Sequence, residues 1–127
     1  MAIEIIELNH VNVTVPKSAE QATKHFYNVV LGLTEIPKPG ESRGRGGAWY
    51  QLPGIQLHLS IDESVSDNQK GKRHICYVVR DLALAEKSFR EAGLEIIPDD
   101  LPVAGWPRFY TRDPGGNRIE IAQRTAS

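Results

Sequence analysis

Three histidines and one glutamate lie in segments of this sequence where apolar and polar residues sit side by side. His58 stands between two leucines, Glu120 stands between two isoleucines, and His10 and His74 each precede an apolar residue. Successive side chains of a strand point to opposite faces, so these four residues belong to one face and their apolar neighbours to the other. Imidazole and carboxylate groups together suit a divalent ion such as Zn, Ni, Fe, Co or Mn. We therefore predict one metal site with these four ligands.

The four positions are related by an internal repeat. Segment 31–37, LGLTEIP, resembles segment 92–98, AGLEIIP, and segment 57–59, LHL, resembles segment 119–121, IEI. His10 falls on His74 at nearly the same offset. Matches in the same order indicate two copies of one unit. The half-repeats cover about 5–61 and 72–124 of a single domain, 1–127. The fourth histidine, His25, has no counterpart and is predicted to be a surface residue of a helix.

Each half is predicted to fold as βαβββ. The first half has strands at 9–15, 33–36, 48–52 and 55–61, and a loop at 37–47. Its helix begins at Ser18, which forms a capping-box pattern with Gln21, and its apolar face contains Ala22, Phe26, Val29 and Val30. A connector is expected at 62–71. The second half has strands at 73–80, 94–97, 107–112 and 117–123, and a helix that begins near Asp81. The fold class is α+β, with mixed sheets that curve around a metal-containing cleft.

Further residues are weaker candidates. Arg43 and Arg45 lie in the glycine-rich loop and could hold an anion, or could simply be solvated. Cys76 has the parity of His74, but a small buried residue is the preferred interpretation. Four aromatic residues of the strands could line a pocket, although strand aromatics are more typical of a core: Trp49, Tyr50, Trp106 and Tyr110.

Composition excludes several classes of protein. The net charge of −1 lacks the basic excess of a nucleic-acid-binding protein. No apolar run approaches the roughly 20 residues of a membrane span, and the acidic start is unlike a signal peptide. The one cysteine excludes an intramolecular disulfide and favours a reducing compartment. We expect a soluble cytoplasmic protein.

The chain resembles the vicinal oxygen chelate superfamily, the glyoxalase/bleomycin resistance/dioxygenase group. The resemblance rests on segments 8–11 (LNHV), 26–33, 73–75 (RHI) and above all 113–120 (DPGGNRIE). In that family the metal ligands come from the first and fourth strands of each half, positions that match His10, His58, His74 and Glu120. Glyoxalase I-like members usually carry a glutamate where this chain has His58, so the glyoxalase I reaction itself is not implied.

The resemblance implies a lyase or isomerase whose small substrate chelates the metal through adjacent oxygens, with Glu120 also the base that moves a proton. It also implies a homodimer in which a site draws His10 and His58 from one subunit and His74 and Glu120 from the other. Alternatives are an iron-dependent ring-cleaving dioxygenase, a fosfomycin-type thiol transferase and a non-enzymatic drug-binding resistance protein. The last group typically lacks the metal ligands.

Overall fold

The computed structural model, which describes residues 2–64 and 71–125, contains two four-stranded sheets. The first has the order β1-β4-β3-β2 and the second β5-β8-β7-β6. In each sheet the first and last strands of the module are parallel neighbours, and the other pairs are antiparallel. The strands are β1 (His10–Val15), β2 (Thr34–Ile36), β3 (Ala48–Leu52), β4 (Ile55–Ile61), β5 (His74–Val78), β6 (Ile97–Pro98), β7 (Arg108–Arg112) and β8 (Arg118–Ala122). This arrangement confirms the predicted α+β fold of two βαβββ modules.

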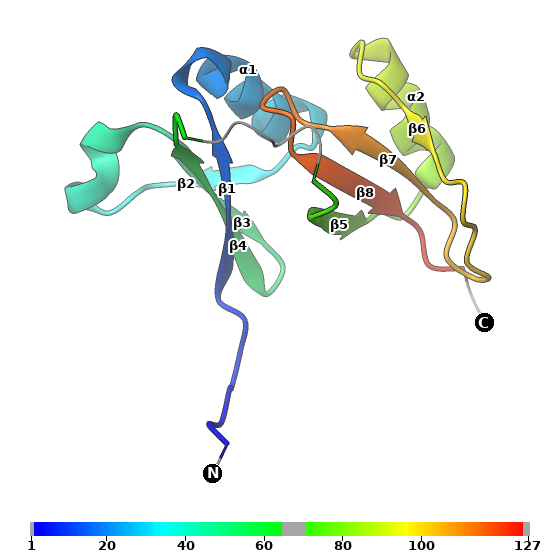
Figure 1. Ribbon diagram of the computed structural model, residues 1–127, viewed down its shortest axis with the longest axis horizontal. Coiled ribbons are helices and arrows are strands. Elements are labelled where there is room, and N and C mark those ends of the chain that lie inside the picture. The colour runs from blue at the N-terminus through cyan, green and yellow to red at the C-terminus, as the bar shows by residue number, and fades with distance from the viewer. Residues whose placement is uncertain (1, 65–70, 126–127) are drawn as a thin grey trace.

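The helical segments join the first and second strands of each module. In the first module they follow one another as η1 (Lys17–Ala19), α1 (Glu20–His25) and η2 (Phe26–Val30), and in the second there is α2 (Leu82–Glu91). Figure 1 shows the two sheets side by side, with α1 and α2 toward the top of the view. Among the described residues, no helix has the length and apolarity needed to cross a membrane.

Three local predictions differ from the structure. The loop predicted at 37–47 contains a short 3-10 helix, η3 (Gly40–Arg45), and the strand predicted at 94–97 is β6, shifted to 97–98. The first helix opens with a 3-10 turn, and no side chain caps η1 or α1, so the predicted capping box of Ser18 and Gln21 is wrong. Asp81 does cap α2, because its side chain accepts a hydrogen bond from the Leu84 amide at 3.0 Å. Most of the predicted connector at 62–71 lies outside the described residues.

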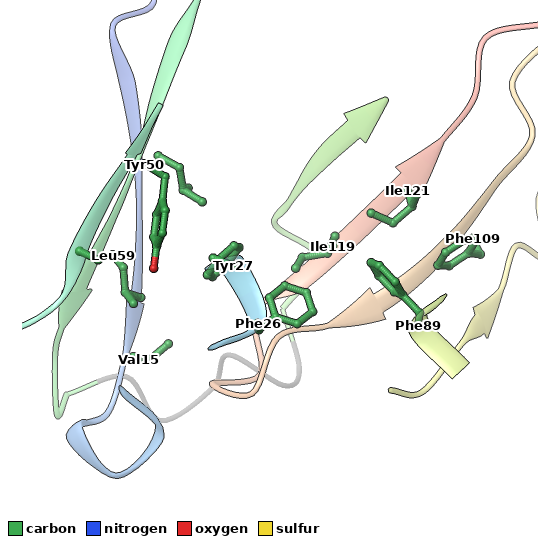
Figure 2. Packing of buried hydrophobic residues seen from close by; sticks show 11 residues of the cluster. Val15, Phe26, Tyr27, Tyr50, Leu59, Phe89, Phe109, Ile119 and Ile121 are labelled. Atoms are coloured by element: carbon green, nitrogen blue, oxygen red, sulfur yellow. The ribbon is translucent and has the colours of Figure 1, made fainter. Parts of the chain in front are cut away.

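The buried face of the first helical segment also differs from the prediction. Ala22 is exposed and Val29 is 63% exposed, whereas Thr23, Phe26 and Tyr27 are buried. The stripe still has helical spacing, but it includes a threonine and a tyrosine that an apolar count overlooks. Figure 2 shows Phe26 and Tyr27 between Tyr50, Leu59 and Val15 of the first module and Ile119 and Ile121 of the second. One core therefore connects both modules.

The turn between β7 and β8 locks the second module against the first. Asp113 is 4% exposed, and its carboxylate accepts hydrogen bonds from the Tyr27 hydroxyl at 2.8 Å and from the amides of Gly115 and Asn117 at 2.9 Å. The Asn117 side chain donates to Asp113 and to the carbonyl of Thr14 in β1. A Cβ atom at Gly115 would lie 2.2 Å from the Val15 side chain, so only glycine permits this close approach.

The register decides which residues share a face. His58 is opposite Asn12 of β1 and Trp49 of β3, while Glu120 is opposite Cys76 of β5 and Tyr110 of β7. The neighbouring apolar residues of these strands pack into the core beneath the helices. The face turned away from the helices, hereafter the open face, therefore carries all four predicted ligands.

Two buried tyrosines provide a matched test of the contact between the β7–β8 turn and the first module. We expect Tyr27→Phe to lower the free energy of unfolding by about 1–3 kcal/mol, because the buried Asp113 carboxylate loses a donor. Tyr50→Phe should be neutral or slightly stabilising, since the Tyr50 hydroxyl is buried without a hydrogen-bond partner among the described residues. Urea unfolding of both variants measures the difference.

The penalty of Tyr27→Phe should also depend on pH. Burial raises the pKa of Asp113 despite its hydrogen bonds. A protonated carboxyl needs the Tyr27 donor less than a carboxylate does, so the penalty should grow as pH rises through that pKa. Equal penalties for both tyrosine variants at neutral pH would contradict the assigned role of Asp113.

Candidate functional site

The first group of predicted ligands is a pair of stacked imidazoles, His10 of β1 and His58 of β4, hereafter the histidine pair. Their ring centroids are 4.1 Å apart with an interplanar angle of 15°. The Trp49 ring stacks on the other face of His58 at 3.8 Å and 4°, so His58 lies inside a stack of three rings. His58 is 7% exposed, whereas His10 is exposed.

The environment of His58 keeps its imidazole in the form that binds a metal. Burial first, and then the nearby His10, lower the pKa of His58 below its ordinary value. The neutral ring keeps one nitrogen lone pair for coordination. Its Nε2 lies 2.9 Å from the Gln56 side-chain oxygen, and the His10 Nδ1 lies 2.9 Å from the Asn9 side-chain oxygen. Because lone pairs lie in the ring planes, two parallel rings can share one ion only after at least one of them rotates.

The second group is an imidazole–carboxylate pair, His74 of β5 and Glu120 of β8, hereafter the His–Glu pair. His74 Nε2 lies 3.0 Å from Glu120 Oε1, and His74 Nδ1 lies 2.9 Å from the carbonyl oxygen of Lys72. Holding Nδ1 on a backbone carbonyl directs Nε2 toward the carboxylate, which is how metal-bound histidines are commonly oriented. Nε2 and Oε1 are within hydrogen-bond distance of each other. A cation placed between them would be bound by both atoms.

Glu120 is held on its other oxygen. The Trp106 indole nitrogen donates to Oε2 at 2.9 Å, and the Arg108 guanidinium lies 3.6 Å from it. Burial alone would raise the pKa of Glu120, but hydrogen bonds from Trp106 and Cys76 and the charge of Arg108 hold it below its ordinary value. Glu120 is therefore an ionised carboxylate with a fixed orientation, although it is only 3% exposed.

Cys76 also belongs to this part of the open face. The preferred interpretation as a buried core residue is wrong, because Cys76 is exposed and its thiol contacts Glu120. Its parity with His74 was the better guide. Although the residue as a whole is exposed, its sulfur is partly buried, and this partial burial with the charge of Glu120 raises the pKa of Cys76 to about 12. The thiol therefore stays protonated and is a poor metal ligand in this setting.

The structure places the four predicted ligands in two separate pairs, and the four side chains do not come together in one group. Among the described residues of one chain, no three His, Cys, Asp or Glu side chains lie close enough to hold a metal ion. The expectation that all four converge therefore does not hold within a single chain. Each pair nevertheless supplies two donors of suitable chemistry, and each lies on the open face of its own module.

The remaining candidates have separate locations. Arg43 donates to the Lys38 carbonyl from η3, and no contact joins Arg43 or Arg45 to either pair among the described residues. His25 is exposed, as predicted. Of the four strand aromatics, Tyr50 is a core residue, Trp49 and Trp106 contact predicted ligands, and Tyr110 lies beneath two guanidinium groups. No pattern in the sequence points to Arg108, because its role depends on how segment 99–108 folds.

A family model and a similar crystal structure agree on the family to which this chain is related. The model of the Glyoxalase/Bleomycin resistance protein/Dioxygenase superfamily matches residues 7–121. A crystal structure from Bacillus anthracis, described as a glyoxalase family protein, is 30% identical with a TM-score of 0.85, and the match covers 98% of this chain and 100% of that one.

More distant structures share the fold. A glyoxalase/dioxygenase from Nostoc punctiforme is 20% identical with a TM-score of 0.78, over 99% of this chain and 100% of that one. A variant of the fosfomycin resistance protein FosX from Listeria monocytogenes is 17% identical with a TM-score of 0.81, over 96% and 95% of the two chains. That protein was crystallised with Mn(II) and 1S,2S-dihydroxypropylphosphonic acid.

The contact between Trp106 and Glu120 can be tested without any metal. We expect Trp106→Phe to raise the pKa of Glu120, because the carboxylate loses a hydrogen-bond donor while it stays buried. Titration of the Glu120 carboxyl carbon by NMR in chelator-treated protein measures the shift. Trp49→Phe is the matched control, since Trp49 stacks on His58 and should leave Glu120 unchanged. An unaltered Glu120 titration in Trp106→Phe would show that the indole does not hold the carboxylate.

Proposed function

Because this chain belongs to the Glyoxalase/Bleomycin resistance protein/Dioxygenase superfamily, we propose that it is a divalent-metal-dependent enzyme with a small substrate that bears two adjacent oxygens. The observation that carries the proposal is the separation of the predicted ligands into two complementary pairs on the open face. The histidine pair offers two imidazoles, and the His–Glu pair offers an imidazole and an ionised carboxylate. Together they form a four-ligand set suited to Zn, Ni, Fe, Co or Mn.

The complete site requires a second copy of the chain. One chain places the two pairs in separate modules, so four ligands surround one ion only if the histidine pair of one subunit faces the His–Glu pair of its partner. A C₂ homodimer brings both combinations together and creates two equivalent sites. The apolar residues that precede β1 support this assembly, since Ile3, Ile5 and Ile6 are 78–85% exposed in the isolated chain. Exposed apolar segments of this kind commonly mark contact surfaces.

Glu120, Trp106 and Arg108 have separate roles in the proposed reaction. The ion, when bound, acts as a Lewis acid that polarises the adjacent substrate oxygens. Glu120 is ionised and can accept a proton from the substrate, while Trp106 and Arg108 fix its orientation through Oε2. Proton transfer next to a polarised oxygen is the chemistry of lyases and isomerases. The FosX complex, in which a vicinal diol accompanies Mn(II), supports a substrate with adjacent oxygens.

Subunit mixing tests where the site lies. One variant carries His10→Ala and His58→Ala, and the other carries His74→Ala and Glu120→Ala. Each alone should lose metal affinity by at least ~10–100-fold. A heterodimer of the two should recover about one ion, against about two in the wild-type dimer, because one of its two sites again has all four ligands. Metal analysis of co-expressed heterodimers, purified through two different tags, gives the stoichiometry.

The same experiment distinguishes the alternatives. A site closed within one chain leaves the heterodimer without metal. Full metal content in both homodimeric variants would remove these residues as ligands. His25→Ala is the control for a histidine outside the pairs and should bind metal as the wild type does.

A second substitution separates the two roles of Glu120. In Glu120→Gln the amide oxygen still coordinates an ion, though more weakly, but it cannot accept a proton at neutral pH. We expect the metal-saturated variant to bind substrate, and we expect its turnover rate to fall about 10²–10⁴-fold. Exchange of solvent hydrogen into the substrate, followed by NMR, should disappear in parallel.

Wild-type turnover by metal-saturated Glu120→Gln would exclude proton abstraction by Glu120. Oxygen consumption by the iron-loaded protein would then indicate a dioxygenase, and thiol-dependent loss of an epoxide would indicate a fosfomycin-type transferase. Ligand binding without any turnover would indicate a drug-binding protein.

A further inference from the structure

A cavity of about 340 Å³ lies in the seam between the two modules, where the edge strands β1 and β5 approach each other. Apolar residues of both modules and Tyr27 contribute to its lining. The polar part of the wall combines Asn12 of β1 with Arg73, His74 and Arg118 of the second module. Its volume suits a small molecule and no larger ligand.

The charged side chains among the described residues of this cavity are basic. Arg73 and Arg118 both line it, and the described residues of its lining include no aspartate or glutamate. Among the described residues, neither arginine forms an ion pair with a carboxylate, whereas the nearby Arg108 is paired with Asp99 at 3.0 Å. Two arginines that line one cavity without an ion pair among the described residues favour an anionic ligand.

The orientation of Arg118 is set by its neighbours. Its guanidinium carbon lies 4.2 Å from the centre of the Tyr110 ring, and a guanidinium stacked on an aromatic ring keeps its N–H groups free at the edge. In the sheet, Arg118 is opposite His74 of the His–Glu pair. An anion bound by Arg118 would thus lie beside a proposed metal ligand.

The opposite wall supplies a neutral donor. The Ser60 hydroxyl donates to the Asn12 side-chain oxygen at 2.7 Å, which fixes the amide and leaves its NH₂ group available. The cavity therefore offers hydrogen-bond donors from both modules, and an oxyanion can accept from them simultaneously.

We propose that this cavity binds the oxyanion group of the substrate, a carboxylate or a phosphate or phosphonate group, through Arg73 and Arg118. The statement about the substrate rests on the proposed function, whereas binding of an oxyanion to the cavity does not. The substrate class becomes a small acid whose adjacent oxygens lie beside His74 while its anionic group enters the seam.

Anion binding is measured on the chelator-treated full-length protein, with inorganic phosphate as one probe and oxalate as the other at constant ionic strength. We expect the arginine side-chain N–H signals of Arg73 and Arg118 to shift in NMR titrations. Arg73→Gln and Arg118→Gln should each weaken binding about tenfold or more, since charge-assisted hydrogen bonds are lost. Arg118→Lys, which keeps the charge, should retain part of the affinity and guards against loss through misfolding. Arg80→Gln, an exposed arginine outside this cavity, should have no effect.

The outcomes separate this proposal from the metal site. Arg118→Gln should keep metal affinity or increase it, because a positive charge near the ion is removed. Unchanged phosphate and oxalate affinity in both glutamine variants would overturn the anion site and leave the metal proposal intact. Wild-type protein that binds phosphate but no metal would overturn the proposed function alone. Preference for phosphate over oxalate would assign a phosphate or phosphonate group, and the reverse preference a carboxylate.

Discussion

The buried carboxylate of Asp113 is the contact on which the arrangement of the two modules depends. It is surrounded by donors from the β7–β8 turn and by the Tyr27 hydroxyl, and no basic group is paired with it among the described residues. A buried carboxylate is costly unless its oxygens are satisfied, so the turn and η2 can occupy only the positions that satisfy them. The contact of Gly115 with Val15 brings the same turn against β1.

The contact of Asp113 with Tyr27 explains why the predicted ligands occur in two pairs. It fixes the sheets side by side with a common core beneath the helices, and each open face keeps its own two ligands. The pairs differ in electrostatics as well as in position. His58 lies in an aromatic stack with a lowered pKa, while Glu120 is surrounded by donors that hold it ionised. In the proposed intersubunit site, the imidazole of His58 and the charged carboxylate of Glu120 would complement each other.

The incorrect predictions about burial rest on residue type. The predicted helical face contains only apolar residues, yet Thr23 is buried and Tyr27 is buried with its hydroxyl on Asp113. Cys76 was assigned to the core on residue type, although strand parity places it beside Glu120. For Tyr27 the partner that permits burial is Asp113, 86 residues further along the chain, which a local pattern cannot reveal. For Cys76 the local pattern of strand parity was the correct guide.

The sequence by itself determined the repeated βαβββ plan, the strand parity and hence the face of all four predicted ligands, because period-two alternation and an internal repeat are local properties. Only the tertiary structure decided that His10 stacks on His58, that Trp106 and Arg108 hold Glu120, and that Arg73 and Arg118 line one cavity in the seam between the modules. The first two relations depend on strands and segments that come together within one module, and the third depends on the docking of the two modules, so none of them follows from a local pattern.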